Sequence, residues 1–243
     1  MISTLHKNFI YSFILIFIFT NNFLLAQDAR RKEHPQTDWA NLKKYEADNK
    51  RVNSMQSREH LIVFMGNSIT ESWETIDSSF FTGKPYINRG ISGQTTPQML
   101  VRFREDVIEL KPSIVIILAG INDIAENTGP ASLENIFGNI VSMAELAKAN
   151  NIKVVLSSVL PANEFTWRPD LKPAEKVVKL NAMIKSYAEK NKIIYVDYHS
   201  AMVNEKKGLK SEYTHDGIHP TLAGYKVMEP LVEEAISRAL ISK

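Results

Sequence analysis

Short apolar runs alternate with longer amphipathic stretches along most of this chain. Such alternation predicts parallel strands joined by right-handed helical crossovers, with helices covering both faces of one sheet. We therefore predict an α/β fold, a single-domain three-layer α/β/α sandwich with a central, mostly parallel five-stranded sheet. The predicted strands are residues 61–65, 86–88, 113–119, 153–159 and 193–197, and the predicted helices are residues 97–110, 132–150, 173–190 and 220–241.

Length, charge and cysteine content narrow the range of functions. The 243 residues suit one domain with a sizeable core, and the sequence shows no internal repeat or low-complexity linker. A formal net charge of +2 without a basic stripe gives no indication of nucleic-acid binding. The absence of cysteine excludes disulfides, a thiol nucleophile and cysteine-ligated zinc.

The first 26 residues resemble a secretory signal peptide. Lys7 precedes an apolar run at residues 9–19, and a second short apolar run ends at Ala26, where we expect cleavage. The alternative is an uncleaved membrane anchor. Its apolar core is short for a membrane span, and the basic residues 30–32 lie on the wrong side for an inward-facing N-terminus. We therefore expect an exported protein, periplasmic or extracellular, with no membrane span after cleavage.

The rest of the chain divides into two parts. Residues 27–55 are predicted to form an N-terminal helical segment packed on the core, because Trp39, Leu42 and Tyr45 recur at helical spacing. Residues 56–243 form the main domain. Its longest predicted loop, residues 161–172, follows the fourth strand, and loops at this edge of a sheet commonly carry function. The sequence does not indicate an oligomeric state.

Polar segments follow the predicted strands or precede the last helix at four places. In open α/β sheets ligands bind at the carboxyl ends of the strands, so we expect these segments to converge. Each has an ordinary interpretation when taken alone, as a turn or a helix cap. The four segments are residues 66–70 (Gly-Asn-Ser-Ile-Thr), 88–96 (Asn-Arg-Gly-Ile-Ser-Gly-Gln-Thr-Thr), 119–123 (Ala-Gly-Ile-Asn-Asp) and 216–220 (Asp-Gly-Ile-His-Pro).

Ser68, Asp216 and His219 have the side chains of a hydrolytic triad. Ser68 follows an apolar strand and Gly66, which allows a sharp turn, and it could also cap the next helix. A helix N-terminus favours negative charge that develops nearby. We predict Ser68 as the nucleophile, His219 as the base and Asp216 as the group that orients the base.

Two alternatives involve neighbouring residues. Asp197 and His199 lie two apart on a predicted strand and so share a face, where they could form a rival acid–base pair. Alternatively, His215, Asp216 and His219 could bind zinc with a fourth ligand from elsewhere, although their spacing lacks the usual helical or cysteine pattern.

The four segments, in this order, resemble those of the SGNH hydrolases, also called GDSL-type esterases and lipases. The resemblance extends from about residue 61 to residue 219, with Asn67 where the family more often has aspartate. It implies a flavodoxin-like sheet and no metal or organic cofactor. It also implies the catalytic residues Ser68, Asp216 and His219, and an oxyanion hole made by the N–H groups of Ser68 and Gly93 and the side-chain amide of Asn122.

The resemblance implies a carboxylic ester hydrolase that acts through an acyl-serine intermediate. Export and the absence of a lid-like apolar insertion favour a short acyl group, acetyl in particular, on a carbohydrate or other small-molecule ester. Trp73, Trp167 and Arg168 are the candidate substrate-binding residues, since aromatic rings stack on sugars or cover acyl chains. The alternatives are a lysophospholipase or thioesterase-type acylhydrolase of the same fold, and a non-catalytic carbohydrate-binding protein, which would need no base beside a hydroxyl.

Overall fold

The computed structural model describes residues 38–55 and 60–241. Residues from Ala40 onward belong to one compact unit, and of the residues before it the structure describes only Asp38 and Trp39. The predicted signal peptide with its cleavage point at Ala26, and the beginning of the predicted N-terminal helical segment, therefore lie outside the described residues.

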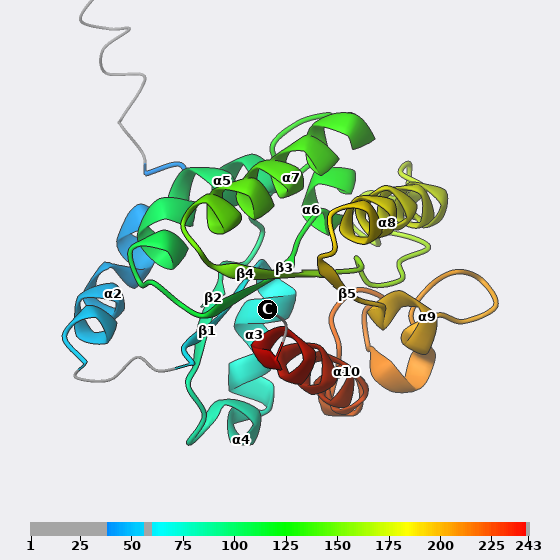
Figure 1. The fold of residues 1–243 in the computed structure, drawn as a ribbon. Helices are drawn as coiled ribbons and strands as arrows, with labels where there is room; N and C mark the ends of the chain where they lie inside the picture. Colours follow the sequence, from blue (N-terminus) through cyan, green and yellow to red (C-terminus); the bar gives the residue numbers. More distant parts are fainter. Residues whose placement is uncertain (1–37, 56–59, 242–243) are drawn as a thin grey trace, which may run out of the picture. The chain divides into compact units, whose positions relative to one another are not determined.

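Five parallel strands form one sheet in the order β2-β1-β3-β4-β5 (Figure 1). This is the flavodoxin-like order, in which the first strand lies inside the sheet and the chain reverses direction beside it. β1 and β3 are buried along their whole length, as their unbroken apolar sequences predict. The predicted fold class is confirmed. The strands are β1 Ile62–Gly66, β2 Tyr86–Gly90, β3 Ile114–Leu118, β4 Lys153–Ser157 and β5 Ile194–Val196.

Helices cover both faces of the sheet, because each crossover between parallel strands needs one. Figure 1 shows α5, α7 and α8 over one face and α3 and α10 over the other. Their apolar faces join the strands in a single cluster of buried side chains. The helices are α2 Glu46–Asn53, α3 Ser68–Ile76, α4 Ser78–Phe81, α5 Thr96–Phe103, α6 Ile121–Ile124, α7 Leu133–Ala149, α8 Pro173–Lys190, α9 Tyr198–Met202 and α10 Leu222–Ile241.

Some predicted boundaries differ from the structure. The predicted helix 97–110 ends as an α-helix at Phe103 and continues as the π-helical turn η2, Arg104–Ile108. In the predicted N-terminal helical segment, the described residues form the 3₁₀ turn η1, Leu42–Tyr45, and then α2. The short elements α4, α6, α9 and the 3₁₀ turn η3, Ser211–Tyr213, were not predicted, since one helical turn has no apolar period to detect.

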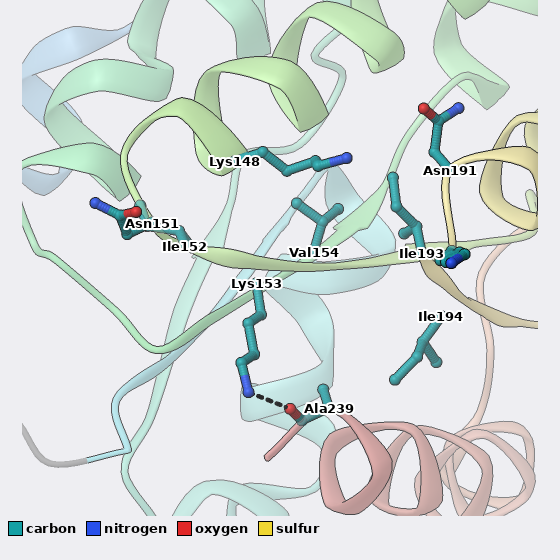
Figure 2. A pocket seen from close by; sticks show the side chains of 10 residues that line it. Lys148, Asn151, Ile152, Lys153, Val154, Asn191, Ile193, Ile194 and Ala239 are labelled. Carbon is teal, nitrogen blue, oxygen red and sulfur yellow. Dashed lines mark hydrogen bonds between the residues drawn. The ribbon is translucent and has the colours of Figure 1, made fainter. Parts of the chain in front are cut away.

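A cavity of about 360 Å³ lies at the amino ends of β4 and β5, the opposite edge from the one predicted to carry the site (Figure 2). The C-terminal ends of α7, α8 and α10 line it. Lys153 Nζ donates to the carbonyl oxygen of Ala239 at 2.9 Å, which satisfies one of the orphan carbonyls at the end of α10. This cavity therefore holds a capping contact at the end of α10. Its lining residues are Lys148, Asn151, Ile152, Lys153, Val154, Asn191, Lys192, Ile193, Ile194 and Ala239.

Across residues 38–55 and 60–241, we find no helix whose length and apolar character would let it cross a membrane.

Candidate active site

The turn that presents Ser68 is built by the two residues before it. Asn67, which is buried, caps α3 by accepting the Ile69 N–H at 3.0 Å. The sequence suggested Ser68 as the cap, but Asn67 has that role. A side chain at Gly66 would collide with Thr70, so only glycine permits this close turn. Ser68 is thereby placed, half-buried, as the first residue of α3 at the carboxyl end of β1.

Ser68, His219 and Asp216 form a continuous hydrogen-bonded chain. Ser68 Oγ lies 2.9 Å from His219 Nε2, and His219 Nδ1 lies 2.6 Å from Asp216 Oδ2. Residues 151 positions apart in sequence are thus within proton-transfer reach. The side chains of His219 and Asp216 are 39% and 46% exposed, so the chain of bonds opens to solvent and to a small molecule.

The Asp216 carboxylate is held in its ionised form. Its Oδ1 accepts the backbone N–H groups of Ile218 and His219 at 2.9 and 2.8 Å. Partial burial alone would raise the pKa of Asp216, but the hydrogen bonds from His219 and the two N–H groups outweigh it and lower the pKa to about 2. An ionised carboxylate on Nδ1 leaves Nε2 of a neutral His219 free to accept the Ser68 proton.

Gly93 lies in the loop after β2 and Asn122 in the short helix α6 after β3, and these two strands flank β1. Gly93 has a φ of +76° and is exposed, and its N–H has no hydrogen-bond acceptor among the described residues. A side chain here would meet open space, so the positive φ, not crowding, favours glycine. Asn122 is buried and donates from Nδ2 to the carbonyl oxygen of Gln94 at 3.0 Å, which leaves one amide hydrogen available.

The rival pair Asp197 and His199 is not joined in the structure. Both carboxylate oxygens of Asp197 cap α9 by accepting from Ser200, at 2.9 and 2.7 Å. Within the described ranges no hydrogen bond links Asp197 to His199, and burial lowers the pKa of His199. Likewise, in the part of the chain that the structure describes, no three histidine, cysteine or carboxylate residues come together as metal ligands would.

The prediction that Trp73 contacts substrate is wrong, because the side chain is only 1% exposed. Trp73 lies on the same face of α3 as Ile69 and Thr70, which is the face that packs on the sheet. Its ring stacks on Phe80 and Tyr225, with centroids 4.9 and 5.2 Å away. Trp73 therefore belongs to the core of the fold.

Trp167 and Arg168 occupy the loop after β4, as predicted, and Arg168 contacts Glu126, which follows α6. Trp167 is 48% exposed and packs against Phe165. Arg168 Nη2 lies 3.0 Å from Glu126 Oε2. Asn127 Nδ2 in turn donates to the carbonyl oxygen of Gly93 at 3.1 Å. The loop of Trp167 is thus connected to the loop of Gly93, which keeps both residues as candidates for substrate contact.

The sequence analysis missed the buried polar residues that bond to the Ser68 turn and to the loop of Gly93. Arg102 on α5 is fully buried and donates to the Gly66 carbonyl at 3.0 Å, to Gln94 Oε1 at 2.6 Å and to Asp106 Oδ2 at 2.8 Å. One guanidinium thus contacts both the Ser68 turn and the Gly93 loop. A signal existed, since Arg102 and Asp106 interrupt the apolar face of a predicted amphipathic helix.

Several known proteins are similar to this chain in sequence. A model described as the GDSL-like lipase/acylhydrolase family matches residues 64–227, which include the five residues Ser68, Gly93, Asn122, Asp216 and His219. The chain is 28% identical over 164 residues to the esterase TesA of Pseudomonas aeruginosa, across 65% of this chain and 75% of that protein. It is 24% identical over 147 residues to an acetylxylan esterase of Geobacillus stearothermophilus, across 58% of this chain and 67% of that protein.

Solved structures of two Bacteroides proteins are more similar in sequence to this chain, each at 53% identity. A GDSL-like lipase from Bacteroides thetaiotaomicron is 53% identical, with a TM-score of 0.80, and the match covers 83% of this chain and 99% of that one.

Proposed function

The chain belongs to the GDSL-like lipase/acylhydrolase family and is a carboxylic ester hydrolase, and we propose that Ser68, His219 and Asp216 carry out its chemistry. The observation that carries the proposal is the pair of short distances, 2.9 Å from Ser68 Oγ to His219 Nε2 and 2.6 Å from His219 Nδ1 to Asp216 Oδ2. Nucleophile, base and orienting group stand in the order that acyl transfer to a serine needs.

In the proposed reaction, Ser68 Oγ attacks the ester carbonyl while His219 Nε2 takes the hydroxyl proton. Asp216 stabilises the imidazolium that forms. The tetrahedral intermediate collapses when His219 passes this proton to the leaving alcohol, so the alcohol departs and Ser68 is acylated. His219 then takes a proton from water, whose oxygen attacks the acyl carbon, and returns it to Ser68 Oγ as the carboxylic acid leaves.

The negative charge on the carbonyl oxygen needs donors that are already in place. Ser68 supplies its N–H from the first turn of α3, where helix N–H groups lack partners within the helix. Gly93 supplies an N–H without an acceptor among the described residues, and Asn122 the remaining hydrogen of its amide. In this proposal the segments after β2 and β3, the two strands that flank β1, supply the donors for the oxyanion that forms at Ser68.

We propose that the substrate is a short-chain ester, in particular an acetyl ester of a carbohydrate. The similarity to an acetylxylan esterase supports this choice. An exposed indole at Trp167, on the loop that contacts Glu126, suits a sugar ring that stacks while its ester enters the site. Export is part of the same proposal, because the predicted signal peptide would deliver the enzyme to polysaccharides outside the cytoplasm.

Covalent labelling tests the catalytic assignment. A fluorophosphonate probe should react once per chain, at Ser68, and should fail to react with Ser68→Ala. His219→Ala should react far more slowly, because its serine lacks a base. Labelling of Ser68→Ala at the wild-type rate would place the nucleophile elsewhere. No labelling of the wild-type protein would favour a binding protein over an enzyme.

A substrate panel tests the acyl preference. We expect a higher kcat/KM for acetylated xylo-oligosaccharides than for 4-nitrophenyl esters of long fatty acids. A clear preference for the long chains would replace the carbohydrate proposal with a lysophospholipase or thioesterase-type activity. For export, the mass of the mature protein should correspond to cleavage after Ala26, and recovery of the uncut chain in the membrane fraction would indicate an anchor instead.

A further inference from the structure

The carboxylate of Glu71 accepts hydrogen bonds from the loop that carries Gly93. Glu71 Oε2 accepts the backbone N–H of Ser92 at 2.7 Å and also accepts the Ser92 hydroxyl. Ser92 is the residue immediately before Gly93, and Glu71 lies one turn after Ser68 on α3. A single side chain therefore joins the helix of the nucleophile to the loop of the proposed oxyanion donor.

A turn and the bonds on either side of Gly93 together direct its N–H, and the turn is closed by the Gln94 N–H donating to the Ile91 carbonyl at 3.3 Å. Glycine at positive φ has wide conformational freedom, and Gly93 is exposed. The N–H of Ser92, one peptide earlier, is held by Glu71, and the carbonyl of Gly93, one peptide later, accepts from Asn127 at 3.1 Å. The Gly93 N–H between these two bonds has no acceptor in the described part of the chain, so it stays available to a ligand.

Glu71 is itself firmly placed. Its backbone N–H donates to the Asn67 carbonyl at 2.9 Å, and its other carboxylate oxygen pairs with Lys44. A side chain at Gly90 would collide with the backbone of Glu71, so the end of β2 packs directly on this turn of α3. Partial burial would raise the pKa of Glu71, but hydrogen bonds from Lys44 and Ser92 outweigh it and lower the pKa. An ionised acceptor makes the stronger hydrogen bond.

We propose that Glu71 is a positioning residue that aims the Gly93 N–H at the oxygen of a substrate bound to Ser68. The inference rests on the proposed function, in which Gly93 stabilises the oxyanion. Glu71 touches no reacting atom, and its effect passes through Ser92. Its removal should therefore weaken stabilisation of the transition state more than binding of the substrate.

Three variants on α3 test this role with 4-nitrophenyl acetate as substrate. Glu71→Ala should lower kcat about 10- to 100-fold, since a misplaced donor costs less than the loss of a donor. KM should stay within about twofold, as expected for an interaction made only in the transition state. Glu71→Gln keeps an oxygen that can accept the Ser92 N–H, so it should restore kcat to within about fivefold of wild type.

Glu74→Ala is the matched control, because Glu74 is an exposed glutamate on the same helix whose side chain bonds to none of the residues that the structure describes. It should match the wild type in kcat and KM. All variants should unfold well above the assay temperature, since Glu71 and Glu74 are both partly or fully exposed. The affinity for phenylboronic acid, whose adduct with Ser68 places an oxygen in the oxyanion position, should fall in Glu71→Ala in proportion to kcat/KM.

The outcomes separate this inference from the proposed function. Equal kcat in Glu71→Ala and Glu74→Ala, or a rise in KM at unchanged kcat, would overturn the positioning role while wild-type turnover and labelling of Ser68 remain. A boronic acid affinity that is unchanged in Glu71→Ala would overturn it as well. If the wild-type protein neither turns over the ester nor reacts at Ser68, the proposed function fails and the inference fails with it.

Discussion

The two halves of the proposed active site are held in different ways. Asp216 and His219 lie in one short loop, and the carboxylate is fixed by groups of that same loop, from Thr214 to His219. The loop of Gly93 is fixed from a distance. Glu71 and Ala40, which lie 21 and 54 positions before their partners, bond to Ser92 and Gln94.

Because of this difference, substitutions in the two halves should affect turnover and the free energy of unfolding differently. The base half is exposed and self-contained, so a substitution there should change the reaction and leave the fold intact. The donor half is continuous with buried polar groups beneath it, including Arg102 and Asp106. A substitution in that half should change the rate and the free energy of unfolding together. The free energy of unfolding therefore distinguishes the two halves, since it should stay nearly constant for substitutions in the base half and fall for those in the donor half.

The largest effect is expected from His219→Ala. Loss of the base should lower kcat by roughly a million-fold, as removal of one member of a cooperating triad does. The thermal unfolding midpoint should hardly change, because the side chain is 39% exposed. His199→Ala is the matched control and should keep most of the activity. If His199→Ala abolished turnover and His219→Ala did not, the base would have to be reassigned.

A smaller loss of kcat is expected from Asp216→Ala, about 10,000-fold, because Asp216 acts through His219. With a folded-state pKa of about 2, below the unfolded value, the carboxylate contributes stability above about pH 4 that is lost as the pH falls through about 2. Acid unfolding of wild type and variant measures this contribution. A kcat loss equal to that of His219→Ala, with the fold intact, would show that Asp216 does more than orient the base.

Arg102→Leu tests the donor half. It should lower the free energy of unfolding by about 3–5 kcal/mol, because Asp106 would stay buried without its charged partner. It should also lower kcat, since the Ser68 turn and the Gly93 loop lose a shared donor. Denaturant unfolding and steady-state kinetics measure the two effects.

The double variant Arg102→Leu with Asp106→Leu is the control, because it removes both buried charges. It should regain part of the stability but not the kcat, since the contacts to Gly66 and Gln94 stay absent. Full recovery of kcat in the double variant would show that Arg102 affects the site only through stability.

Asp123 allows a test of the donor half through the pH dependence of stability. Its carboxylate is 3% exposed and accepts the Thr96 N–H and hydroxyl, and burial raises its pKa to about 6 despite these bonds. The folded state then holds a proton that the unfolded state releases near pH 4, so stability should fall as the pH rises from about 4 to about 6. The change is about 3 kcal/mol. Asp123→Asn should flatten this part of the stability profile, and an unchanged profile would contradict the assignment.

The features that could be predicted from the sequence are those that depend on residues close together in the chain. The strands and long helices follow from apolar period, and the bonds between Asp216 and His219 follow from a spacing of three residues in one loop. The meeting of Ser68 with His219 follows from topology, because parallel strands bring their carboxyl ends to one edge. For these features a segment and its neighbours carry most of the information.

The parts that sequence did not predict depend on tertiary contacts. Nothing near Glu71 indicates that its carboxylate receives the Ser92 N–H, since that bond depends on how β2 packs on α3. The same limit explains the error at Trp73. A helix position next to a nucleophile can face the site or the core, and only the rotation of α3 on the sheet decides which. Here Ile69 and Trp73 share the core face.

The two tryptophans predicted to bind substrate supply the smallest expected effect. Trp167→Ala should raise KM for an acetylated xylo-oligosaccharide by about 3- to 10-fold, which is the scale of one stacking contact. It should leave KM for 4-nitrophenyl acetate unchanged, because that ester has no sugar to stack. Trp73→Phe should lower the free energy of unfolding and leave both KM values unchanged, since Trp73 packs on Phe80 and Tyr225. An equal rise in KM for both esters in Trp167→Ala would mean that the loop shapes the acyl site and does not bind the carbohydrate.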